Sequence, residues 1–117
     1  MIEIMVNTAR FRVAVKGHAT PEESAQYREI CSAVSALAQG MMFSLNRVND
    51  EGGAYKSVEY RPDPGDLMIR VYPEHWAERE ARRRIDIYAD GMELLAMAHS
   101  ESVHMIRDGE EIRRAES

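Results

Sequence analysis

The sequence predicts an α+β fold, in which two helices cover one mostly antiparallel sheet in the order ββαββαβ. Three observations predict it. Two segments near the N-terminus alternate apolar and polar side chains, as strands do. Two long segments repeat apolar residues every three or four positions, as amphipathic helices do. Two further β-rich segments precede the second helix and one follows it. We expect one domain over residues 1–109 and a charged tail, 110–117, that frays.

The first two strands are expected at residues 2–7 and 11–16, joined by a short turn into a β-hairpin. The second of them alternates cleanly between apolar and polar residues. Gly17 ends this strand and leaves His18 at its tip.

The other three strands are expected at residues 54–60, 67–72 and 102–107. A proline- and glycine-containing turn at 62–66 joins the first two of these. The segment 67–72 is almost continuously apolar, which is typical of a strand in the interior of a sheet.

The first helix has a strong start signal in Thr20, Pro21 and Glu23, which match a cap, a first helical residue and a capping box. Gly52 and Gly53 mark its end. Its apolar stripe consists of Ile30, Val34, Leu37, Met41 and Leu45.

The second helix is expected from about His75 or Trp76 to His99. Gly91 lies inside it and costs about 1 kcal/mol relative to alanine, so we expect close packing at that position. Its apolar stripe consists of Ile85, Tyr88, Met92, Leu95 and His99.

Composition and charge exclude several classes of protein. The chain has 117 residues, of which 44% are hydrophobic and 30% charged, and its net charge is −5. A negative net charge argues against nucleic-acid binding, because neutralising phosphates needs a basic face, and acidic residues interleave with the one basic cluster, 79–84. A single cysteine, an acidic residue where a signal peptide needs basic ones, and the lack of a long apolar run predict a soluble cytoplasmic protein with no membrane partner.

The chemistry of the chain is expected at Cys31, its only cysteine, and at His18. A cysteine nucleophile acts as the thiolate, which a nearby imidazole and the N-terminus of a helix both favour. Free backbone N–H groups at a helix start can also hold an oxyanion. Ser35 lies one helical turn after Cys31, within reach of the sulfur or the imidazole.

The remaining histidines, His75, His99 and His104, follow no metal-ligand spacing. We therefore expect neither a metal ion nor a cofactor.

Two short motifs carry a resemblance to a known family. Lys16-Gly17-His18-Ala19 follows the predicted hairpin, and Cys31-Ser32-Ala33-Val34-Ser35 lies in the first helix. Together they resemble the ribosomal-processing cysteine proteases (Prp, or YsxB-like family), whose signature is Gly-His-Ala followed by Cys-Ala-Ala-Val-Ser. Chain length and element order are also similar to the family.

The resemblance implies a homodimeric protease with a Cys–His dyad. Cys31 would be the nucleophile and His18 the general base and acid, with Ser35 and Gly17 in supporting positions. Family members remove a short N-terminal leader peptide, ending in paired phenylalanines, from a large-subunit ribosomal protein, and phage-associated relatives process virion proteins. The segment 19–30 would be a mobile lid that closes over the substrate.

The sequence departs from the family pattern just before the cysteine. The family usually has Gly-x-Asp there, whereas residues 26–29 of this chain all suit a helix interior, and the His18–Cys31 separation is one residue longer. Either the helix breaks near Tyr27, or it is continuous from Pro21 and Cys31 lies deep inside it. The second case favours a catalytically impaired peptide-binding homodimer, or a structural dimer with an inert thiol.

Overall fold

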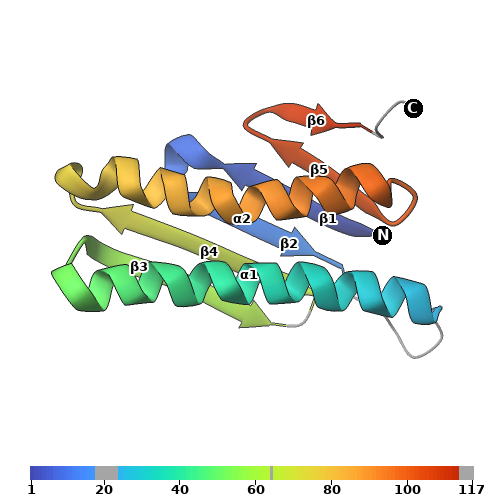
Figure 1. Ribbon diagram of the computed structural model, residues 1–117, viewed down its shortest axis with the longest axis horizontal. Coiled ribbons are helices and arrows are strands. Elements are labelled where there is room, and N and C mark those ends of the chain that lie inside the picture. The colour runs from blue at the N-terminus through green and yellow to red at the C-terminus, as the bar shows by residue number, and fades with distance from the viewer. Residues whose placement is uncertain (18–23, 64, 114–117) are drawn as a thin grey trace.

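The computed structural model describes residues 1–17, 24–63 and 65–113. It contains a six-stranded sheet and two long helices (Figure 1). The strands are β1 (Ile2–Asn7), β2 (Arg12–Lys16), β3 (Tyr55–Asp63), β4 (Asp66–Pro73), β5 (Val103–Arg107) and β6 (Glu110–Ile112). The helices are α1 (Ala25–Gly52) and α2 (Glu78–Ala98), with short 3₁₀ turns at Thr8–Arg10 and His75–Ala77. The predicted α+β class is confirmed.

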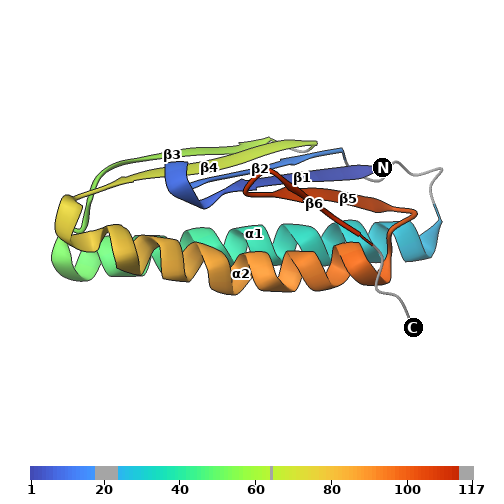
Figure 2. The ribbon, with the colours of Figure 1, turned by 90° about the horizontal axis from the view of Figure 1, so that it is seen from above.

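The strands lie in the order β3-β4-β2-β1-β5-β6, and every neighbouring pair is antiparallel except β1 and β5, which are parallel. The predicted N-terminal hairpin is therefore confirmed, and β4 is the interior strand that its apolar sequence indicated. Both helices cover the same face of the sheet, so the molecule has two layers (Figure 2). The alternate residues Ile2, Ile4 and Val6 of β1 are buried under them.

Helix α1 begins later than the start signal predicts. Ser24 is its N-cap, and the Ser24 hydroxyl accepts a hydrogen bond of 3.1 Å from the backbone N–H of Tyr27. The helix then continues without interruption to Gly52, so the alternative of a break near Tyr27 does not occur. The predicted start at Thr20, Pro21 and Glu23 lies outside the described residues.

The two helices pack through glycines. A Cβ atom built on Gly40 of α1 would lie 2.9 Å from Cε1 of Tyr88, and one built on Gly91 of α2 would lie 3.0 Å from Cδ2 of Leu37. Each glycine thus admits a large side chain of the opposite helix. The close packing predicted at Gly91 is confirmed, and it explains why a poor helix former lies in α2.

The C-terminal region corrects a second prediction. Residues 110–112 form β6 and pair with β5, although we expected fraying from residue 110 onward. Asp108 and Gly109 both have positive φ, at 51° and 84°, which is the conformation of a tight hairpin turn. The Asp108 carboxylate also accepts hydrogen bonds from the backbone N–H and the hydroxyl of Thr8, at 2.7 and 2.9 Å. Asp-Gly therefore continues the sheet here instead of ending it.

Arg107 ties β5 to α2. Its guanidinium donates to the carboxylates of Asp90 (2.7 Å) and Asp86 (3.1 Å), and its side chain is only 15% exposed. Burial lowers the pKa of Arg107, but the hydrogen bonds to Asp90 and Asp86 and the negative charges of these two carboxylates together outweigh burial, and the net shift is upward.

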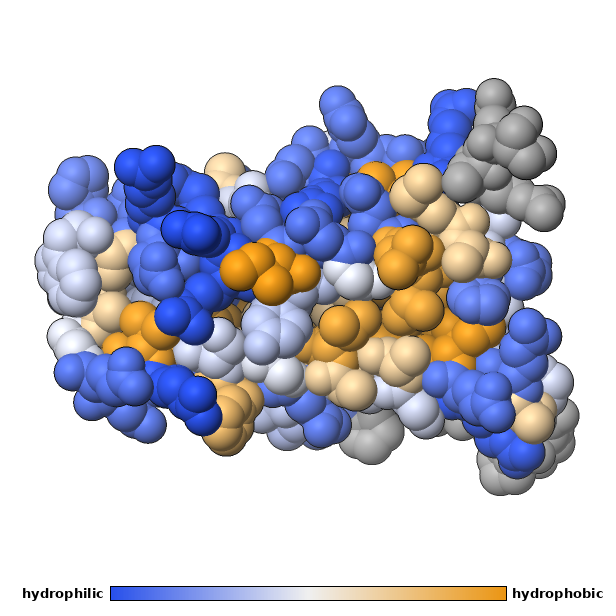
Figure 3. All heavy atoms as spheres, in the orientation of Figure 1, coloured by the Kyte–Doolittle hydropathy of each residue, from blue (hydrophilic) through white to orange (hydrophobic). Residues whose placement is uncertain are grey.

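The outer face of the helix layer carries exposed apolar side chains. Hydrophobic residues gather along the middle of this face in the space-filling view (Figure 3). Phe43 of α1 and Ile87 and Leu94 of α2 are each more than half exposed. Neither helix is apolar over a stretch long enough to span a lipid bilayer, within the part of the chain that the structure describes.

Candidate active site

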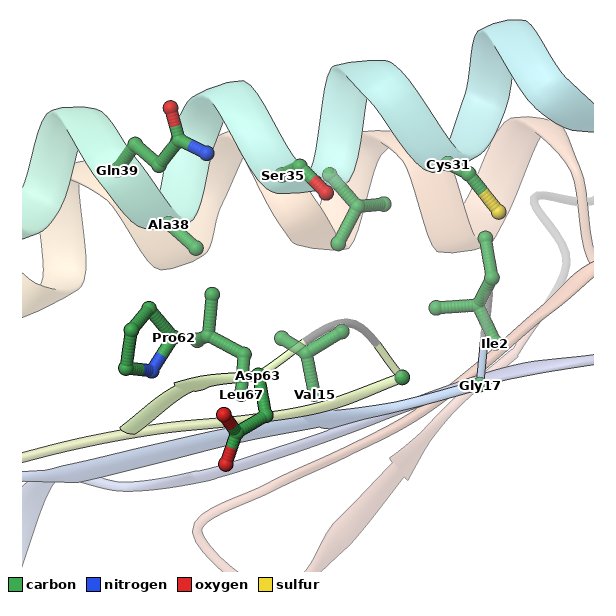
Figure 4. A pocket seen from close by; sticks show the side chains of 12 residues that line it. Ile2, Val15, Gly17, Cys31, Ser35, Ala38, Gln39, Pro62, Asp63 and Leu67 are labelled. Carbon is green, nitrogen blue, oxygen red and sulfur yellow. The ribbon is translucent and has the colours of Figure 1, made fainter. Parts of the chain in front are cut away.

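A pocket of about 210 Å³ lies between α1 and the sheet, at the end where β2 finishes and β4 begins (Figure 4). Its walls come from four places in the chain: the start of β1, the end of β2, one side of α1 and the β3–β4 hairpin. The lining residues are Ile2, Val15, Gly17, Cys31, Val34, Ser35, Ala38, Gln39, Pro62, Asp63, Gly65 and Leu67. The pocket therefore contains Gly17, Cys31 and Ser35, three of the four site residues that the sequence predicts.

Helix α1 contributes the reactive side of the pocket. Cys31, Ser35 and Gln39 follow one another at intervals of one turn, so they share one side of the helix. The Cys31 sulfur points from α1 toward the sheet, above Ile2 and Gly17 (Figure 4). Cys31 is partly exposed and lines the pocket, and it also packs against the hydrophobic core.

Gly17 ends β2 in a backbone conformation that its surroundings require. Its φ is +90°, and its backbone N–H donates to the Gly65 carbonyl at 3.0 Å. A Cβ atom here would overlap the carbonyl oxygen of Met1. Only glycine fits this position without strain. His18 follows directly in the sequence and lies outside the described residues, so the structure gives no His18–Cys31 geometry.

The distance of Cys31 from the start of α1 corrects the expected electrostatics. Cys31 lies about two turns after Ala25, whereas the field of a helix N-terminus acts mainly within its first turn. Backbone N–H groups at this depth pair with carbonyls four residues earlier and do not face a ligand. The expectation that free amides of α1 flank the sulfur is therefore wrong. Among the described lining residues, the side-chain donors are Ser35 and Gln39.

The structure also corrects the lid that the family resemblance implies for residues 19–30. The second half of the predicted lid, Ala25–Ile30, forms the first turns of α1, and Ile30 is buried in the core. Residues 19–23 lie outside the described residues. Any lid movement that includes Ala25–Ile30 would therefore have to unwind helix.

Metal ligation finds no support around the sulfur. Within residues 1–17, 24–63 and 65–113, no three His, Cys, Asp or Glu side chains gather closely enough to hold an ion. The one carboxylate among the described lining residues belongs to Asp63, whose side chain projects toward the side of the sheet away from α1 (Figure 4).

Sequence reasoning missed the contribution of the β3–β4 hairpin. Pro62, Gly65 and Leu67 form the pocket wall opposite α1, but their pattern indicated only a turn. The sequence did hold a signal for the wall that α1 forms: the four-residue spacing of Cys31, Ser35 and Gln39 marks a polar side of that helix. The sequence could not show that a hairpin some thirty residues further along lies against that side.

A family model matches most of the chain. The family model described as cysteine protease Prp matches residues 1–106. A search of curated protein sequences gave no match.

Solved structures resemble this one across most of its length. SMU.848 from Streptococcus mutans has a TM-score of 0.63 at 17% identity, covering 91% of this chain and 90% of that one. The ribosomal processing protease Prp from S. aureus with a substrate peptide gives 0.63 at 17% identity, covering 91% and 96%. The same S. aureus protease with a covalently linked product peptide gives 0.60 at 18% identity, with the same coverage. At these identities the likeness establishes the fold.

Proposed function

Because this chain belongs to the family of the cysteine protease Prp, we propose that it is an endopeptidase that removes a short N-terminal extension from a large-subunit ribosomal protein. A phage virion protein is the other substrate that the family resemblance allows. The observation that carries the proposal is that Cys31 and Gly17, the neighbour of His18, line one pocket. The S. aureus protease of the same fold is described with a covalently linked product peptide, which is what a nucleophilic cysteine would leave.

In the proposed reaction, Cys31 Sγ attacks the scissile carbonyl carbon and the His18 imidazole takes the thiol proton. The C–N bond then breaks, and His18 returns the proton to the leaving amine. Water attacks the resulting thioester, and His18 takes a proton from that water. The thioester breaks to a carboxylate product, and the thiol is restored.

The oxyanion needs hydrogen-bond donors that the start of α1 does not supply. Ser35 is exposed and lies one turn beyond Cys31 on the same side of α1, so we assign its hydroxyl to donate to the oxyanion. Gln39 lies a further turn away, where its amide would contact the peptide rather than the reacting carbon.

One observation favours a second candidate function. The position of Cys31 about two turns inside α1 denies it the helix-start field that activates many catalytic cysteines. A protein of this fold that binds the leader peptide without cleaving it would need only the pocket.

Cleavage of a synthetic peptide separates the two candidates. The probe spans the N-terminal extension of a large-subunit ribosomal protein and contains paired phenylalanines, with a matching virion peptide as the alternative. Mass spectrometry should show cleavage by the wild type and none by Cys31→Ala or His18→Ala. Binding of the peptide with equal affinity by the wild type and Cys31→Ala, without turnover, would establish the binding module instead.

We also propose that the protein is a homodimer. The exposed apolar side chains Phe43, Ile87 and Leu94 on the helix face support an interface between copies. Sedimentation of the wild type and of Phe43→Glu tests this. A ribosomal substrate further implies that the protein acts in the cytoplasm.

A further inference from the structure

The free edge of β3 ends at the pocket. Among the described residues, β3 pairs with β4 alone, and it is the edge strand on this side of the sheet. It has nine residues, whereas β6 at the opposite edge has three. Two residues near the end of β3, Pro62 and Asp63, line the pocket that contains Cys31.

The orientation of the β3 backbone follows from one hydrogen bond. The Val71 N–H of β4 donates to the Phe11 carbonyl, which precedes β2, at 3.1 Å. Val71 therefore directs its backbone groups toward β2 and away from β3. Its partner across the ladder is Val58, whose N–H and C=O then point away from β4 to the open edge.

The alternation of a strand extends this orientation along β3. Tyr60 also presents its N–H and C=O to the open edge, and Pro62 presents its C=O alone. A proline within a strand is accommodated where its missing N–H would have faced solvent, and Pro62 fits that rule. The one irregularity in the ladder lies between Tyr55 and Ser57, at the far end from the pocket.

Exposure along β3 leaves this edge accessible. Residues 59 to 63 are all exposed, and Tyr60 is 40% exposed. The end of β3 emerges from beneath α1 in Figure 1, so the helix does not cover it. Long free edges recruit extended peptides by adding them as a further strand.

We propose that the substrate peptide binds by adding a strand to the free edge of β3. This inference rests on the proposed function, because it assigns the edge to the same peptide that Cys31 would cleave. Tyr60 lies two residues, or about 7 Å, before Pro62. A peptide paired with Tyr60 therefore reaches the pocket at its Pro62 end and continues between the sheet and α1 toward the sulfur. Backbone pairing supplies affinity at Tyr60, while the pocket selects the side chain near the scissile bond.

A pair of substitutions at one position tests the proposal. Tyr60→Pro removes both the side chain and the outward N–H, whereas Tyr60→Ala removes the side chain and keeps the N–H. Both are made in the Cys31→Ala protein, and binding of the fluorescein-labelled ribosomal leader peptide is followed by fluorescence anisotropy. We expect Tyr60→Pro to bind about five- to tenfold more weakly than Tyr60→Ala, as the loss of one hydrogen bond requires.

Peptides with a single backbone N-methyl group provide a second test, which needs no change in the protein. Methylation should weaken binding at every second position of the segment that pairs with β3, and only slightly between them. Equal affinity of Tyr60→Pro and Tyr60→Ala, together with no alternation in the N-methyl series, would overturn strand addition.

Two further outcomes are distinguishable. If the wild type cleaves the peptide, and Tyr60→Pro and Tyr60→Ala made in the protein that keeps Cys31 cleave it at equal kcat/KM, strand addition fails and the protease assignment stands. If Tyr60→Pro changes sedimentation of the protein but leaves peptide binding unchanged, a second copy occupies the edge and the proposal is wrong. A wild type that neither binds nor cleaves either peptide would reject the proposed function and this inference together.

Discussion

Replacing Gly17 with alanine should destabilise the protein more than the same change at Gly53 or Gly109, which also have positive φ. The residue has φ of +90°, which costs an L-residue about 1–2 kcal/mol. The added Cβ would also overlap the Met1 carbonyl oxygen, far inside the 3.0 Å that real Cβ atoms keep. Relieving that overlap must move backbone, at about 1–3 kcal/mol. Reduced freedom of the unfolded chain returns about 0.5 kcal/mol.

The net expectation for Gly17→Ala is a loss of about 3 kcal/mol in the free energy of unfolding, or roughly 10 °C in Tm. Gly53→Ala is the matched control, because Gly53 also has a positive φ, of 61°, but its added methyl group would meet no atom within 4 Å beyond its chain neighbours. It should lose only about 1 kcal/mol. Urea unfolding followed by circular dichroism measures both. Equal losses for the two variants would show that the contact with Met1 does not constrain the end of β2.

Further predictions concern packing, charge and catalysis. Gly40→Ala should cost about 1 kcal/mol net, because its methyl would meet the Tyr88 ring at 2.9 Å, at about 2 kcal/mol, while alanine's higher helix propensity returns about 1 kcal/mol; thermal unfolding will measure it. Arg107→Met should lower the free energy of unfolding by about 1–2 kcal/mol, a modest loss because the partner carboxylates of Asp86 and Asp90 are exposed to solvent. The loss should shrink in 1 M salt. Arg61→Met, which breaks an exposed pair at 3.5 Å, should change stability by less than about 0.5 kcal/mol. Ser35→Ala should lower kcat at least about tenfold with an unchanged urea midpoint, and an unchanged kcat would remove the hydroxyl from the oxyanion site.

Much of the fold follows from local sequence pattern. The alternation in β1 and β2 and the apolar stripes of the two helices depend on neighbours a few residues apart, so the sequence alone indicates them. The prediction misses β6 because it treats Asp108-Gly109 as an end of regular structure, although Asp-Gly is also a strong hairpin signal. It places the start of α1 too early because Thr20 and Pro21 match a capping pattern, while Ser24 provides the cap.

The site is less predictable because its walls come from distant parts of the chain. The motifs indicate Gly17, Cys31 and Ser35, and the structure brings those three to one pocket. Nothing local indicates that Pro62 faces them, since that contact depends on how β3 and β4 pack beneath α1. The depth of Cys31 within α1 depends on where the helix begins, which capping signals alone leave open.

The rate of Cys31 alkylation by iodoacetamide as a function of pH, in the wild type and in His18→Ala, tests the central claim most directly. A dyad predicts rapid labelling of the folded wild type near neutral pH and a profile displaced toward alkaline pH when the imidazole is removed. Superimposable profiles for the two proteins, with labelling no faster than that of free cysteine, would contradict the assignment of His18 and Cys31 as a catalytic pair.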